Sequence, residues 1–176
     1  MEAQLSEKMG MTANLDIFVR PKPLNKKPEE PDYLEGVWKF LRRESNLFVN
    51  TGYNVVANRL IGAGTYSSTT FNYFAWGDGT TAPALTRTAA DFYSDCANDD
   101  TKAVTSIDAF DVPSLTLRFN CFLSSTDNAV VTIKKFALMN ADPGTVMFNE
   151  MLFSSPLSKD SYQEYYFRYN LTFSQV

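Results

Sequence analysis

The clearest alternation of apolar and polar positions runs through residues 114–123. The apolar positions of this segment fall at every second residue: Leu115, Leu117, Phe119 and Cys121. Because successive side chains of a strand point to opposite faces, this period of two predicts a strand with one face in a core. Cys121 is then expected to act as a small buried hydrophobe.

The last third of the chain predicts a hairpin and a long closing strand. Residues 129–139 and 145–153 are strand-like and are separated by the turn signal Asn140-Ala-Asp-Pro-Gly144. The closing strand covers residues 162–173, and one of its sides carries Tyr165, Phe167, Tyr169, Leu171 and Phe173.

Upstream, residues 37–41, 47–49 and 71–76 also have strand character, and the charged stretch 42–46 separates the first two. Residues 86–93 fit either a strand or a helical turn. The apolar spacing in residues 53–61 predicts one short helix at an end of the fold. Asn50 or Thr51 is its expected N-cap and Gly62 its expected stop.

About eight short strands at this spacing predict an all-β fold, an antiparallel β-sandwich that is jelly-roll-like, with one short helix. We expect this domain to cover residues 36–176. Residues 1–35 are expected to form an extended N-terminal arm, because residues 20–32 hold four prolines and seven charged side chains and cannot bury a core.

The arm has enough apolar surface to dock on a neighbouring subunit, which predicts an assembly; a flexible tail is the alternative. The residues predicted to make the assembly contact are Leu15, Ile17, Phe18, Val19, Pro21, Pro23, Pro28 and Pro31.

Composition supports a globular β-protein, with 44% hydrophobic and 20% charged residues and with 14 Phe, 9 Tyr and 2 Trp. The formal net charge of −4 argues against a nucleic-acid partner. No segment resembles a signal peptide or a membrane span, so we expect a soluble protein made in a cytoplasm, with no membrane partner. Reduced thiols are favoured there for Cys96 and Cys121, and pairing of the two stays open.

Histidine is absent, which removes the commonest general base and the commonest zinc ligand. Paired carboxylates of the glycosidase type are the remaining catalytic possibility. The candidate carboxylates Glu35, Glu44, Glu150 and Glu164 are expected to be solvated at the surface. The acidic cluster Asp95, Asp99 and Asp100 lacks the spacing of a calcium loop. We therefore predict no catalytic, metal-binding or cofactor-binding residues, and no enzyme.

The segment Phe71-Asn-Tyr-Phe-Ala-Trp-Gly-Asp-Gly-Thr-Thr-Ala-Pro83 joins an aromatic strand to a glycine-paired turn. The predicted structural turn comprises Gly77, Asp78, Gly79 and Pro83, with glycines that allow positive φ. A phosphate-binding loop is disfavoured, because the lysine and the third glycine of nucleotide motifs are missing.

A carbohydrate-binding module is an alternative to a structural role, because aromatic side chains on a sandwich can stack on sugars. The candidates for such a platform are Tyr73, Trp76, Tyr165 and Tyr169.

The order of motifs over residues 46–173 resembles a family of small structural proteins of tailed bacteriophages. The matching segments are Asn46-Leu-Phe-Val-Asn-Thr-Gly52, Gly77 to Pro83, Phe136-Ala-Leu-Met-Asn140, Gly144-Thr-Val-Met-Phe148, Phe153-Ser-Ser-Pro156, Lys159 and Tyr166 to Phe173. The chain departs from the family at Lys134 and Lys135, where an acidic residue and a glycine are more usual.

This resemblance implies a virion protein that acts by binding, in the tail, baseplate or fibre-attachment apparatus. Its partners would be tail, baseplate or major capsid subunits, and it would form a homo-oligomer. Capsid decoration is the alternative location, and a carbohydrate-binding module is the alternative function.

Overall fold

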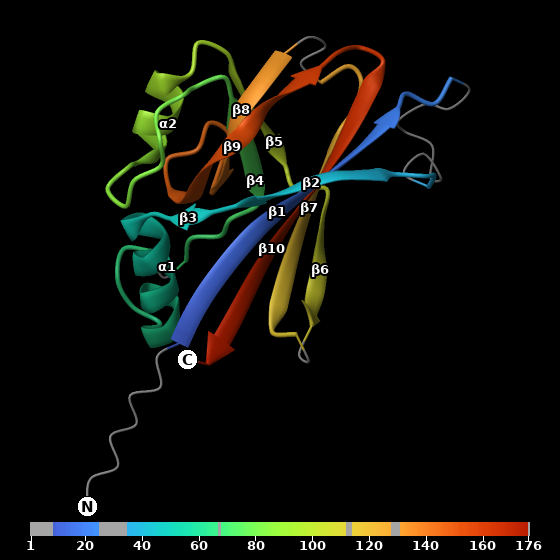
Figure 1. Ribbon diagram of the computed structural model, residues 1–176. Coiled ribbons are helices and arrows are strands. Elements are labelled where there is room, and N and C mark those ends of the chain that lie inside the picture. The colour runs from blue at the N-terminus through green and yellow to red at the C-terminus, as the bar shows by residue number, and fades with distance from the viewer. Residues whose placement is uncertain (1–8, 25–34, 67, 112–113, 128–130, 176) are drawn as a thin grey trace, which may run out of the picture.

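Two five-stranded antiparallel sheets pack face to face and enclose the main hydrophobic core (Figure 1). The computed structural model describes residues 9–24, 35–66, 68–111, 114–127 and 131–175. Sheet A has the strand order β2-β1-β10-β7-β6, and sheet B has the order β3-β9-β8-β4-β5. The predicted all-β antiparallel sandwich is therefore confirmed.

The strands, with the two helices in chain order, are β1 Met9–Pro21, β2 Lys39–Ser45, β3 Leu47–Phe48, α1 Asn50–Ile61, β4 Tyr73–Gly77, α2 Ala89–Asp95, β5 Asp99–Ala103, β6 Ser106–Asp111, β7 Thr116–Leu123, β8 Val131–Met139, β9 Met147–Lys159 and β10 Gln163–Gln175. The predicted hairpin is the β8–β9 pair, and the predicted closing strand is β10.

β1 occupies the position next to the centre of sheet A. It pairs along its whole length with β10, from Met9 opposite Gln175 to Pro21 opposite Gln163, and its other edge pairs with β2. Leu15 and Ile17 are buried in the main core. The N-terminal segment that was expected to reach a neighbour is thus a strand of the chain's own sandwich.

The expectation of a separate arm is therefore wrong for residues 9–21, and so is a domain boundary at residue 35. Leu15 and Ile17 are buried and do not face a neighbour, whereas Phe18 and Val19 are half-buried and Pro21 is exposed. The proline at position 21 ends the strand and does not interrupt it, which is compatible with its missing N–H. Pro23 follows Lys22, whose N–H donates to the Tyr162 carbonyl at 2.8 Å. Pro28 and Pro31 lie outside the described residues.

The core side chains alternate along the strands as predicted in β7 and β10. Phe119 and Cys121 of β7 and Phe167 and Tyr169 of β10 are buried between the sheets. Leu115 is an exception, because it precedes β7 with a φ of 50° and is partly exposed. Aromatic rings connect the two sheets through Phe136 of β8. Its ring centroid lies 4.7 Å from that of Phe74 in sheet B, and 5.9 and 6.4 Å from those of Phe167 and Tyr169 in sheet A.

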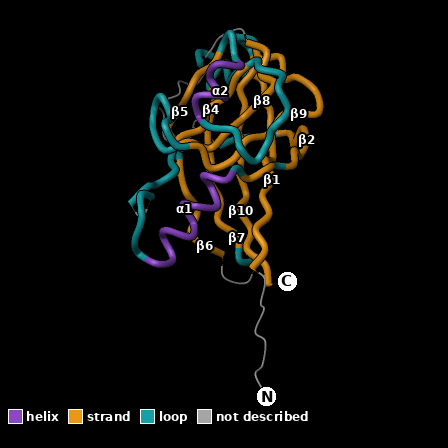
Figure 2. Tube along the Cα trace, turned by 90° about the vertical axis from the view of Figure 1, so that its left-hand side faces the viewer, coloured by secondary structure: helices purple, strands orange, loops and turns teal. Residues whose placement is uncertain are grey.

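The helices lie at different heights: α2 lies over sheet B near one end of the sandwich, and α1 lies nearer the other end, where Val56 packs against the main core (Figures 1 and 2). α1 begins at Asn50, three residues before the predicted start, and ends as predicted at Gly62, which has the left-handed conformation (φ 64°). Its N-cap is Val49, without a side-chain cap, and not Asn50 or Thr51. The ambiguous residues 86–93 contribute to α2. Thr88 and Asp91 form a capping box there, which supplies the helix start.

The charged stretch expected to separate two strands lies within β2. Its side chains are used on both faces, because Arg43 donates to Asp16 at 2.6 Å and Glu44 accepts from the hydroxyl of Ser154 at 2.9 Å. Because both faces of β2 find polar partners, this polar segment forms a strand.

Replacing Ile17 with Ala tests the role of β1. We expect the free energy of unfolding to fall by about 2–5 kcal/mol, because a buried core side chain is truncated. The matched control is Leu24→Ala, since Leu24 is 95% exposed and its loss should change stability by about 0.5 kcal/mol at most. Urea denaturation measures both, and equal effects of the two substitutions would contradict the placement of β1.

Candidate functional site

Three of the four candidate carboxylates are buried, so the expectation that they are solvated is wrong for Glu44, Glu150 and Glu164; Glu35 is exposed. Each buried carboxylate has a cation beside it. Glu44 pairs with Arg42 at 2.7 Å, and Glu164 pairs with Arg20 at 2.9 Å. Arg42 lies two residues from Glu44 on β2, whereas Arg20 is 144 positions from Glu164, so that the second pair was not evident in the sequence.

The largest ionic cluster lies under α2, on the face of sheet B that is turned away from sheet A. Lys135 of β8 is fully buried, and its Nζ lies 2.5 Å from Asp95 Oδ2 and 2.9 Å from Glu150 Oε1. Arg87 Nε lies 2.6 Å from Glu150 Oε2. The backbone N–H of Thr81 donates to Asp95 at 3.1 Å. The cluster therefore fixes α2 and the loop before it to the sheet.

The pKa of Asp95 reflects this environment. Burial acts to raise it, but hydrogen bonds from Lys135 and Thr81 and the charge of Lys135 outweigh burial and lower the pKa to about 2. A carboxyl group that stays ionised at neutral pH does not serve as a general acid. The cluster contains two cations and two carboxylates in mutual contact, and its evident role is structural.

Gly77, Asp78 and Gly79 begin a loop, and the predicted tight turn with positive φ is wrong, because neither glycine has a positive φ. Both glycines are required by close packing. A Cβ on Gly77 would lie 2.4 Å from Cys96 Sγ, and one on Gly79 would lie 2.4 Å from Asp95 Oδ2. Asp78 accepts from the backbone N–H groups of residues 97 and 98 at 2.8 and 3.0 Å.

Pro83 is partly buried in the same loop, which continues to a turn at residues 85–86. The segment thus packs against the α2–β5 connection. The sequence signal of paired glycines was real, but it marked close contact and not a turn.

Metal-binding and thiol chemistry find little support in the described part of the chain. No group of three or more His, Cys, Asp or Glu side chains there could hold a metal ion. Asp95 is engaged with Lys135, and Asp99 and Asp100 lie on β5. Cys96 and Cys121 are free thiols, and burial raises the pKa of Cys121 to about 12.

The predicted aromatic platform does not form. Trp76, Tyr165 and Tyr169 are buried in the core, and of the four candidates only Tyr73 is partly exposed. The assignment failed because aromatic residues occupy both faces of several strands, so that alternation alone does not distinguish the inner face from the outer one.

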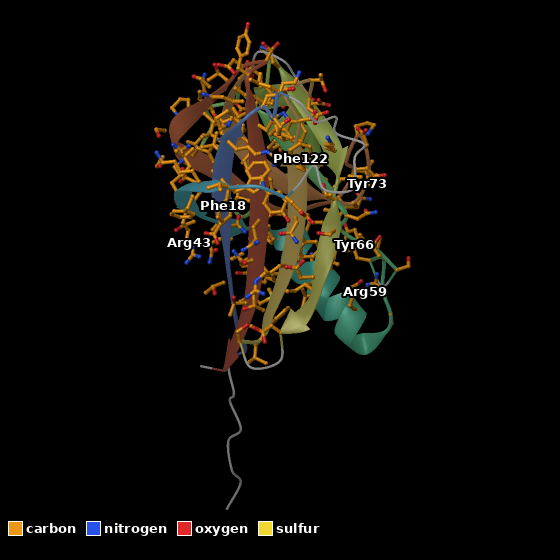
Figure 3. All side chains as sticks on the ribbon, turned by 90° about the vertical axis from the view of Figure 1, so that its right-hand side faces the viewer. Phe18, Arg43, Arg59, Tyr66, Tyr73 and Phe122 are labelled. Carbon is orange, nitrogen blue, oxygen red and sulfur yellow. The ribbon has the colours of Figure 1, made fainter. Side chains whose placement is uncertain are left out.

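A second aromatic cluster, missed in the sequence, lies on the outer face of sheet A, which Figure 3 views with Phe18 and Phe122 labelled. The ring of Tyr166 on β10 lies between Trp38 at 5.6 Å and Phe18 at 6.3 Å. Phe122 of β7 meets Trp38 edge to face at 6.0 Å. Phe18, Trp38, Tyr166 and Arg168 line an open pocket of about 280 Å³.

A second hollow of about 410 Å³, which we call the end surface, lies where β1 ends. It is lined by Val19, Arg20, Pro21, Val37, Lys39, Asp160, Tyr162 and Gln163. Two of its apolar side chains are almost fully exposed, Val37 at 92% and Tyr162 at 77%. The end surface therefore combines exposed apolar groups with charges of both signs.

Comparisons with known proteins give no relative: no family model, no curated protein and no solved structure matches this chain. Within the described residues, neither helix is long and apolar enough to cross a membrane.

Replacing Asp95 with Asn tests the ionic cluster. The pKa of Asp95 in the folded protein, about 2, lies below its ordinary value of 3.8, so its stabilising effect is complete above the ordinary value and is lost as the pH falls towards 2. We expect Asp95→Asn to lower the urea midpoint at pH 7, and the difference from the wild type to shrink as the pH falls below about 4.

The control for this experiment is Asp142→Asn, in the exposed turn between β8 and β9, which should leave the midpoint unchanged at every pH. A wild-type-to-Asp95→Asn difference that stays constant down to pH 2 would contradict the ion-pair assignment.

Proposed function

We propose that this chain is a bacteriophage virion structural protein of the tail, baseplate or fibre-attachment apparatus, and that it acts by binding neighbouring subunits. The observation that carries the binding role is the end surface, where Val37 and Tyr162 are exposed beside Lys39 and Asp160. Exposed apolar groups rimmed by polar ones are typical of protein contact sites. The virion assignment is supported by the ordered motifs over residues 46–173.

The chain segment that carries Val37 is held firmly. Arg20 is buried and pairs with Glu164, its guanidinium lies 4.3 Å from the ring centroid of Trp38, and it donates to the Glu35 carbonyl at 3.5 Å. The segment 35–38 is therefore fastened to β1 and β10. A preformed surface loses less conformational entropy on binding than a flexible arm does.

The partner that fits the end surface best is a second copy of this chain. Lys39 and Asp160 line the same hollow with opposite charges. In a contact with two-fold symmetry, Lys39 of each subunit can meet Asp160 of the other, while Val37 and Tyr162 are covered between them. This contact replaces the arm as the proposed route of assembly.

The self-association is tested by light scattering coupled to size-exclusion chromatography. We expect the wild type to have a mass of at least twice the 19.8 kDa of one chain, and Val37→Asp to be monomeric, because a charge would be buried in the contact. The control is Leu85→Asp, a half-exposed position on the loop before α2. A monomeric wild type, or an oligomeric Val37→Asp variant, would refute the contact.

The virion role is tested separately by counting copies per particle with labelled peptides in quantitative mass spectrometry. A ring in the tail or baseplate predicts about 6–24 copies, as expected for closed cyclic assemblies. On the order of hundreds of copies would instead indicate the capsid surface. Absence from purified particles would overturn the virion assignment.

A further inference from the structure

The outer face of sheet A carries an aromatic row beside a polar row. In the aromatic row, Phe18 of β1 lies opposite Tyr166 of β10, which lies opposite Phe122 of β7. In the polar row, two residues along, Asp16 lies opposite Arg168, which lies opposite Asn120. Trp38 covers the aromatic row, and the pocket of about 280 Å³ lies where Arg168 meets the rings.

Of the polar row, Arg168 is the residue that lines the pocket. Asp16 is fully engaged, because it accepts from Arg43 at 2.6 and 2.9 Å and from Asn170 at 3.0 Å. Within the described residues Arg168 forms no ion pair, and its Nε is buried, so a ligand in the pocket would meet its terminal guanidinium nitrogens. Asn120 is only 1% exposed, and its amide donates to Ser106 Oγ at 3.2 Å and to Asp108 Oδ1 at 2.8 Å, so its side chain is bound to β6 and does not line the pocket.

A guanidinium without an ion pair, beside aromatic rings in an open pocket, is suited to a ligand that supplies an anion and an apolar face. The guanidinium of Arg168 can bind an anionic acceptor. It lies 5.4 Å from the ring centroid of Phe18, so the charge and the rings are within reach of one ligand. The aromatic rings can pack against an apolar face of the same ligand.

We propose that this pocket binds a pyranose ring that carries a carboxylate, that is, a uronic acid. The C–H face of the sugar would lie against Phe18, Trp38 and Tyr166, and the carboxylate would meet the guanidinium of Arg168. The volume is close to the lower limit of ligand sites, about 300 Å³, which suits one sugar ring and not a long oligosaccharide. This proposal does not depend on the virion role.

Other ligand classes fit less well. An apolar ligand would leave the Arg168 guanidinium without an anion, and a cationic ligand would be repelled by the Arg168 charge. A neutral sugar would use the rings but leave the guanidinium without its anion. The carboxylate is therefore the discriminating group.

The test is isothermal titration of the full chain with glucuronic acid and galacturonic acid, each compared with glucose or galactose, which differ from them only at C6. We expect the uronates to bind about 10-fold or more tightly than the neutral sugars, because a hydrogen bond to a charged group is gained. Arg168→Gln should abolish this preference. Tryptophan fluorescence should change on binding, because Trp38 lines the pocket whereas Trp76 is buried.

The matched control is Arg118→Gln, which removes a guanidinium from the same face of sheet A, where Arg118 lies 3.9 Å from Asp111. It should bind the uronates like the wild type. Phe18→Ala is the second variant, because it keeps the Arg168 charge and should still weaken binding about 10-fold by removing a ring. Thermal unfolding establishes that each variant is folded.

Three results would overturn the proposal: no uronate binding at about 20 mM ligand, far above the ordinary range of specific sites; equal affinity for uronates and neutral sugars; or wild-type uronate affinity in folded Arg168→Gln.

Discussion

The antiparallel pairing of β1 with β10 is the constraint on which the rest of the structure depends. This register sets Phe18 opposite Tyr166, Arg20 opposite Glu164 and Val19 opposite Tyr165. The aromatic pocket, the buried ion pair and one wall of the end surface are thus consequences of a single alignment. The pairing joins the two ends of the chain, and closing so long a loop costs conformational entropy. This cost is offset by the β1–β10 contacts only when both strands are in place.

Buried ion pairs act here as constraints on that alignment more than as sources of stability. Removing two charges from water costs about as much as their attraction returns, but leaving one of them unpaired is strongly unfavourable. A slip of one residue between β1 and β10 would turn Arg20 and Glu164 to opposite faces. The Lys135 cluster fixes the relative positions of β8, β9 and α2 in the same way, because a shift of any of them would leave a buried charge unpaired.

Sequence periodicity predicted the elements whose burial is one-sided. From this periodicity follow the buried face of β7 with Phe119 and Cys121, the β8–β9 hairpin, β10 and the C-terminal end of α1. β1 was missed because its alternation, Leu15 and Ile17 around Asp16, is short and adjoins a proline-rich segment that resembles a linker. The buried glutamates were missed because their environment depends on contacts such as Arg20 with Glu164, which are 144 positions apart.

The sequence predicted the kind of candidate site, an aromatic surface on a sandwich, but not its position. Aromatic side chains on a sandwich suggested stacking surfaces, yet which ring faces outward depends on register: Tyr165 lies in the core and its neighbour Tyr166 on the outer face. The glycines at 77 and 79 likewise signalled a restricted backbone, and only the approach of Cys96 and Asp95 shows the cause.

The two proposed contacts share a physical element. Val37 lines the end surface and Trp38, its neighbour, lines the aromatic pocket. Arg20 holds both, since it stacks on Trp38 and bonds the Glu35 carbonyl. A subunit that covers Val37 would restrict the motion of Trp38, so it would reduce the entropy that a sugar must remove, and the sugar would favour the subunit contact equally. If both contacts form, they are therefore expected to be coupled through Arg20.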